Sequence, residues 1–150
     1  MRRWRLCTND DGNASLEFIT TGMILLLPLV YLVLVMAAVQ GGVLAVEGAA
    51  RQAVRVFVQA STAQEAQSRA QRAIQFGLKD YGLDAQDATV TVSCSPTPSH
   101  CLHRLGEVTI TVAVSVHLPL VPSAISTHIP LSVPLTATAT ERVSRFWSAQ

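Results

Sequence analysis

The sequence predicts an α+β fold, in which an N-terminal transmembrane helix is extended by one or two helices that pack on a small antiparallel sheet of about three strands. Three observations predict this fold. No charged residue lies between Glu17 and Glu47. Apolar residues then recur at helical spacing to about residue 82, and from Ala88 onward they alternate with a period of two, which is typical of strands.

Changes in composition divide the 150 residues into four segments. Residues 1–12 are expected to form a short polar leader, 13–40 a transmembrane helix, 41–82 a helical stalk and 83–150 an extracytoplasmic β domain. Only 14% of the residues are charged and the formal net charge is +1. A nucleic-acid-binding domain would carry a strongly basic face, so we expect no nucleic-acid partner.

The apolar stretch from Phe18 to Val39 has the length of a membrane span. Its 22 residues give roughly 33 Å of helix, which exceeds a hydrocarbon core of about 30 Å. Pro28 interrupts the stretch, but membrane helices tolerate proline as a kink. Arginines at positions 2, 3 and 5 place the N-terminus in the cytoplasm by the positive-inside rule, which leaves the C-terminal domain extracytoplasmic.

A secretory signal peptide is the alternative interpretation of this stretch. Cleavage would then fall near Val43-Leu44-Ala45. The apolar core is longer than the 7–15 residues that are about typical of such signals, which favours a retained anchor in the cytoplasmic (inner) membrane.

Residues 44–60 continue the helical pattern. Glu47, Arg51, Arg55 and Gln59 are spaced by four and share one face, and Glu47 precedes Arg51 in the favourable order for a helical ion pair. Such a stripe usually faces water. The alternative is a contact surface for a neighbouring subunit.

A second helix is predicted to begin at Thr62, because Thr62 and Glu65 have the spacing of a capping box. Gly77 or Gly82 would end it. Whether this helix continues the preceding one with a bend or packs beside it stays open.

Three strands are predicted over Ala88–Cys94, Glu107–Leu118 and Ile129–Arg142. The second alternates most clearly, with valine, isoleucine and leucine on one face and mainly threonine and serine on the other. Pro130 and Pro134 in the third have the same parity, so both missing N–H groups fall on one side. The third strand is therefore predicted to lie at an edge of the sheet.

Cys94 and Cys101 join the end of the first strand to the approach of the second. In an extracytoplasmic domain a disulfide between them is the prediction. A metal site that also uses His100 and His103 is the alternative, but adjacent His100 and Cys101 fit one tetrahedral ion poorly, so no metal is expected. Cys7 lies in the leader, and His117 and His128 are expected at the surface.

The sequence has no constellation that points to catalysis. It lacks a Gly-rich phosphate loop and a Gly-x-Ser-x-Gly elbow, and its ten acidic residues are scattered. We therefore expect no enzymatic activity, no cofactor and no small-molecule substrate.

The stretch Gly12-Asn13-Ala14-Ser15-Leu16-Glu17-Phe18 resembles the processing site of type IV prepilins. Over residues 10–56 the chain is similar to the TadE-like minor pseudopilins of tight-adherence pili, through the Asp-Gly-x-Ala-x-Leu-Glu-Phe entry, the apolar helix and Glu47-Gly-Ala-Ala-Arg-Gln-Ala-Val-Arg55. The resemblance implies cleavage between Gly12 and Asn13 by a prepilin peptidase, and a role in pilus assembly. It implies as partners other pilin-like subunits, the assembly platform and membrane lipid.

Glu17 is the residue to which the resemblance gives an assembly role. A carboxylate at the edge of hydrocarbon is costly unless it is paired. Cleavage would create an α-amino group at Asn13, and Glu17 is expected to pair with it, in the same chain or a neighbouring one. The alternative is that Glu17 is only an interfacial residue at the end of a membrane anchor. The chain would then be a single-pass, membrane-anchored binding module that keeps its leader.

Overall fold

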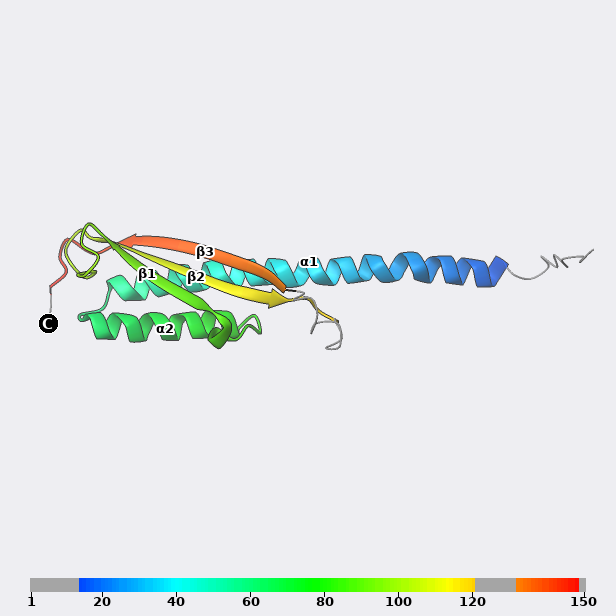
Figure 1. The fold of residues 1–150 in the computed structure, drawn as a ribbon, viewed down its shortest axis with the longest axis horizontal. Coiled ribbons are helices and arrows are strands. Elements are labelled where there is room, and N and C mark those ends of the chain that lie inside the picture. The colour runs from blue at the N-terminus through cyan, green and yellow to red at the C-terminus, as the bar shows by residue number, and fades with distance from the viewer. Residues whose placement is uncertain (1–13, 121–131, 149–150) are drawn as a thin grey trace, which may run out of the picture. The chain divides into compact units, whose positions relative to one another are not determined.

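The structure is a computed structural model that describes residues 14–120 and 132–148. The chain divides into two compact units, Met1–Leu34 and Val35–Gln150. Figure 1 shows the elements, which are α1 (Ala14–Val58), α2 (Ala63–Lys79), the short 3-10 helix η1 (Ala85–Asp87), β1 (Thr89–Ser95), β2 (Glu107–His117) and β3 (Ser132–Arg142). The predicted α+β fold with a three-stranded antiparallel sheet is confirmed.

The first unit contains the first part of α1. Every side chain from Ser15 to Leu34 is exposed, although almost all are apolar. Pro28 lies inside α1, which remains continuous through it. The helix is long and apolar enough to cross a membrane.

The second unit begins with the rest of α1, which is uninterrupted through Gly41 and Gly42. The apolar residues of the helical pattern between residues 44 and 60 are mostly buried, but Leu44 is 59% exposed, whereas its neighbour Ala45 is buried. The difference arises because the buried stripe of the helix runs through Gly42, Ala45, Ala49 and Ala53, and it meets both the sheet, at Gly42, and α2, at Ala49.

Helix α2 is a separate helix that folds back beside α1, which answers the question that the sequence left open (Figure 1). The two helices approach closely, since a Cβ atom at Gly77 would lie 3.2 Å from the Cα of Ala49. α2 ends at Lys79, between the two glycines predicted to end it. Gly77 lies inside the helix, and Gly82 takes the left-handed conformation in the turn that follows (φ 73°).

The predicted cap of α2 is confirmed. Thr62 Oγ1 accepts a hydrogen bond from the backbone N–H of Glu65 (3.2 Å), and the Glu65 carboxylate accepts one from the N–H of Ser61 (3.0 Å). Arg69 lies 2.6 Å from the same carboxylate. The Ser61 N–H, helped by Arg69 and opposed by partial desolvation, holds the pKa of Glu65 below its usual value.

This cap predicts a pH dependence. Because the pKa of Glu65 is lowered in the folded state, its carboxylate stabilises the folded second unit at neutral pH. This contribution is lost as the pH falls through the folded-state pKa, which lies below 4.5. Glu65→Gln should flatten the acid limb of a pH series of unfolding free energies. Thr62→Ala should instead lower stability by about 1 kcal/mol throughout the series. Equal acid limbs in wild type and Glu65→Gln would contradict the assignment.

The sheet has the order β1-β2-β3, so β2 is central and β3 lies at an edge, as predicted. Pro134 of β3 pairs with Ser115, whereas Pro130 and the predicted residues 129–131 of this strand lie outside the described residues. Opposite each other on the outer face, Thr109 and Thr140 bond through their hydroxyls at 2.8 Å. The valine and isoleucine side chains of β2 on the other face are buried.

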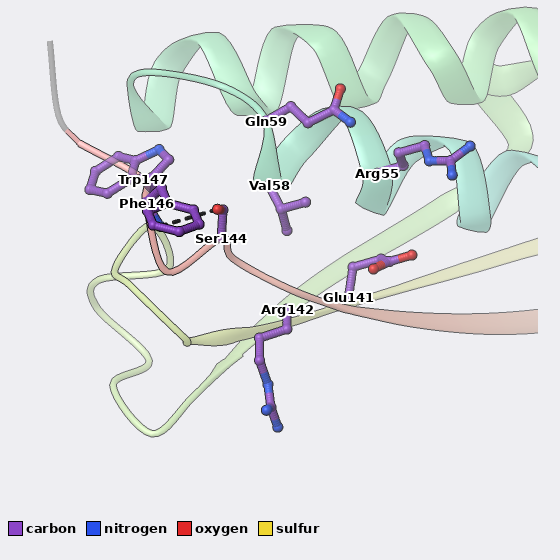
Figure 2. Close-up of a pocket in the computed structure, with 8 residues that line it drawn as sticks. All are labelled: Arg55, Val58, Gln59, Glu141, Arg142, Ser144, Phe146 and Trp147. Atoms are coloured by element: carbon purple, nitrogen blue, oxygen red, sulfur yellow. Dashed lines mark hydrogen bonds between the residues drawn. The ribbon is translucent and has the colours of Figure 1, made fainter.

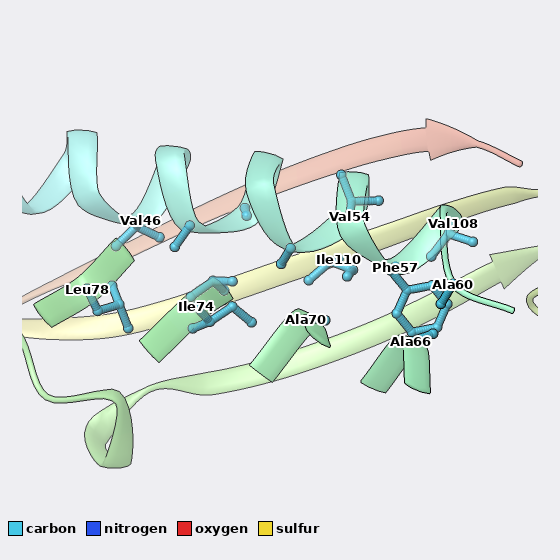
Figure 3. Packing of buried hydrophobic residues seen from close by; sticks show 14 of the residues in the cluster. Val46, Val54, Phe57, Ala60, Ala66, Ala70, Ile74, Leu78, Val108 and Ile110 are labelled. Carbon is cyan, nitrogen blue, oxygen red and sulfur yellow. The ribbon is translucent and has the colours of Figure 1, made fainter. Parts of the chain in front are cut away.

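The core of the second unit lies between the sheet and the two helices. Figure 3 shows buried alanines and larger apolar residues from α1 and α2 against the inner face of β2. Small residues dominate on α1, where Ala49 and Ala53 are completely buried. The helix backbones can therefore pack close to their neighbours, and this core needs few large side chains. Leu78 and Ile110 are the largest completely buried side chains among the described residues.

Candidate functional site

The candidate site at the start of α1 contains Glu17 as an acidic residue in the first helical turn. An acidic side chain there is favoured by the partial positive charge of a helix N-terminus. Among residues 14–120 and 132–148, no ion pair to Glu17 is present. The other two predicted site residues, Gly12 and Asn13, lie outside the described residues.

The helix surface that follows Glu17 is mostly apolar and carries no charge. Phe18 is 81% exposed, and the Thr20 hydroxyl donates to the carbonyl oxygen of Leu16 at 2.7 Å. Thr20 therefore satisfies its donor within the helix, as threonines in membrane helices commonly do. In this part of the structure, Glu17 is left as the single ionisable group from Ser15 to Val30.

A shallow hollow of about 330 Å³ lies on one face of this helix. The residues that line it are Phe18, Thr21, Gly22, Leu25, Leu26 and Leu29. A Cβ atom at Gly22 would meet nothing within 4 Å. Small residues at such positions let another helix backbone come close in a membrane.

The predicted polar stripe on α1 is present. Arg51 Nη2 lies 3.0 Å from Glu47 Oε2, in the predicted order, and Arg51, Arg55 and Gln59 are exposed. The stripe faces solvent in the single chain. Whether it also contacts a neighbouring subunit stays a prediction.

Cys94 and Cys101 form a disulfide, with their Cα atoms 5.1 Å apart, as predicted. Both sulfurs are bonded to each other and are not available to a metal. His103 Nδ1 lies 2.8 Å from the carbonyl oxygen of His100, so this ring is engaged within the loop. A disulfide that closes a loop of this size stabilises a small domain by roughly 2–3 kcal/mol.

A second hollow, which the sequence did not predict, lies where the chain after β3 meets the end of α1. Figure 2 shows Phe146, Trp147, Arg55 and Glu141 around this hollow of about 480 Å³. Trp147 Nε1 donates to the carbonyl oxygen of Ala60 at 2.8 Å, and Arg104 Nε donates to the Trp147 carbonyl at 2.9 Å. The tail after β3 is thus tied to the turn between α1 and α2.

No candidate metal site is found among the described residues. They contain no group of three or more His, Cys, Asp or Glu side chains that could hold a metal ion. Comparisons of the chain with protein-family models, with curated proteins and with solved structures found no match. Glu17, the apolar helix and the disulfide in the second unit are the features of the described residues that bear on function.

Proposed function

We propose that this protein is a membrane-anchored minor pseudopilin of the TadE-like kind, which takes part in assembly of a tight-adherence or type IV-like pilus or secretion apparatus. One observation carries the proposal. Glu17 occupies the first turn of a helix whose next 29 residues contain no Asp, Glu, Lys or Arg, and Gly12 precedes it by five residues.

The assembly role follows from the cost of the carboxylate. At the edge of the hydrocarbon core, Glu17 is stabilised by pairing with a cation. Cleavage after Gly12 would supply that cation as the α-amino group of Asn13. The shallow hollow at Thr21 and Gly22 supports the same role, because a neighbouring pilin-like helix can approach there.

The second unit would then lie outside the cytoplasm. The three arginines before the span favour a cytoplasmic N-terminus in the inner membrane. The Cys94–Cys101 disulfide supports an oxidising compartment for the body. In this proposal the body has a structural role in assembly, without catalysis or a cofactor.

The mature N-terminus tests the proposal. We expect intact mass and terminal sequencing of the membrane-extracted protein to give Asn13 as the first residue when a prepilin peptidase is present. Met1 should remain when the peptidase is absent. Gly12→Leu should block processing, while Gly22→Leu, a matched glycine substitution within the span, should leave it unchanged.

Other starting residues would replace the proposal with a different one. A mature protein that keeps Met1 beside an active peptidase would favour the anchored binding module. A start near Val46 would mean a secreted protein released by signal peptidase.

A further inference from the structure

In the hairpin formed by β2 and β3, charged residues occur at one end only. Between Glu107 and Glu141 the sequence has 33 residues without Asp, Glu, Lys or Arg. At the usual quarter of charged residues, a stretch of this length would carry about eight. The charged residues Glu107 and Arg142 pair at the end of the sheet where β2 begins and β3 finishes (2.6 Å).

The uncharged end of the hairpin lies beside residues 35–42 of α1. A Cβ atom at Gly42 would lie 2.6 Å from Val116 Cγ2 and 2.7 Å from Leu135 Cδ1. Val116 and Leu135 belong to the last four residue pairs between β2 and β3, at the end of β2 and the start of β3. The end of the hairpin therefore meets α1 where the charge-free stretch of that helix still continues, five residues before Glu47.

A hollow of about 450 Å³ opens at this meeting point. Small residues of α1, including Ala38 and Gly41, form one wall, and Tyr81 and Leu83 form another. The Tyr81 ring packs against Gly41, since a Cβ atom there would lie 3.7 Å from Tyr81 Cδ1. Tyr81 is nevertheless 52% exposed.

Leu120 adds an exposed apolar side chain at the same end. It follows His117, which also lines the hollow, by three residues and is 77% exposed. Its backbone has φ 61°, a left-handed conformation that is unusual for leucine. We give the name entry face to the surface formed by Gly41 and Tyr81, which line the hollow, together with the exposed Leu120.

We infer that the entry face rests in the lipid interface of the membrane that α1 crosses. The inference depends on the spanning role of α1 in the proposed function. The charge-free stretch of α1 continues from the span to Gly41 in this face, so a bilayer that surrounds the span would reach the face there. A half-exposed tyrosine is a typical residue of the membrane–water interface. Lys79, Asp80 and Asp84, the exposed charged residues that flank Tyr81, would lie at the level of the headgroups.

Lipid quenching of site-specific labels tests the inference. The full chain with Cys7→Ser, and with the Cys94–Cys101 disulfide intact, would carry a single added cysteine as Leu120→Cys, Thr138→Cys or Leu29→Cys. Each variant is labelled with a nitrobenzoxadiazole fluorophore and reconstituted into phosphatidylcholine vesicles that contain lipids with a nitroxide on the acyl chain. Thr138 is the matched control, because it is exposed on β3 away from the entry face.

We expect the label at position 120 to be quenched severalfold more than the label at 138, and the label at 29 to be quenched as well. Quenching at 29 with equal, weak quenching at 120 and 138 would overturn the inference and leave the span intact. Absence of quenching at all three positions would overturn the span itself. A label at 120 that is shielded from aqueous iodide but not quenched by the lipids would show a protein neighbour on the entry face, which also overturns the inference.

Discussion

Glu17→Ala is expected to abolish assembly while the protein still inserts into the membrane. The apolar stretch is unchanged by the substitution and still has the length to span the bilayer. What is lost is the carboxylate that would compensate the α-amino group of Asn13. Removing one member of an ion pair shielded from water leaves the other uncompensated, so we expect the yield of assembled subunit to fall on the order of 100-fold.

Two further substitutions separate charge from packing at this position. Glu17→Gln keeps the size of the side chain and removes its charge, so it should fail like Glu17→Ala. Thr20→Ala is the matched control, since its hydroxyl is satisfied by the Leu16 carbonyl and is not expected to serve a neighbour. Sheared-surface fractions and membrane fractions would be compared by immunoblot. Normal assembly of Glu17→Gln would remove the ion pair from the proposal.

Leu78→Ala is expected to cause the largest loss of stability in the second unit. Leu78 is 0% exposed and lies among the residues that join α2 to α1 and the sheet. Truncation of a completely buried leucine costs about 2–5 kcal/mol, through lost burial and the cavity that remains. Since domains of this kind are stable by about 5–15 kcal/mol, the variant should unfold at a markedly lower urea concentration.

Phe76→Ala is the matched control for this prediction. Phe76 lies two residues earlier on α2 and is 66% exposed, so its removal should change stability by no more than about 0.5 kcal/mol. Unfolding would be followed in detergent by limited proteolysis across a urea series. Similar losses in the two variants would mean that α2 does not pack on the sheet through Leu78.

The elements could be predicted from the sequence because each rests on a local pattern. The Thr62–Glu65 cap, the alternation in β2 and the Cys94–Cys101 disulfide depend on spacings of a few residues. Ends of elements were less accurate. The short helix η1 was not predicted, although Asp84 caps it through the N–H of Gln86 at 2.9 Å and marks its start.

Contacts between distant segments could not be predicted in the same way. Gly77 was expected to end a helix, but its lack of a side chain serves the close approach of Ala49, 28 positions earlier in the sequence. Leu44 fits the apolar pattern of the helix yet is exposed. Neither fact can be read from periodicity, because both depend on which side of α1 meets its partners. Of the predicted assembly site, the structure describes Glu17 alone.

The bond from Trp147 to Ala60 links positions 87 residues apart, and it has a consequence for when the body can finish folding. Ala60 is made early, but its partner Trp147 is made much later. The same holds for the core, because the completely buried Val143 also lies near the end of the chain. During synthesis the α1–α2 hairpin can form early, because its two helices are neighbours in the sequence. The sheet can be completed only after Arg142 has been made, and the tail can bond to Ala60 only after Trp147 has been made. Until the sheet forms, the inner faces of the two helices have no cover, so the core of the second unit closes only when most of the chain has been made.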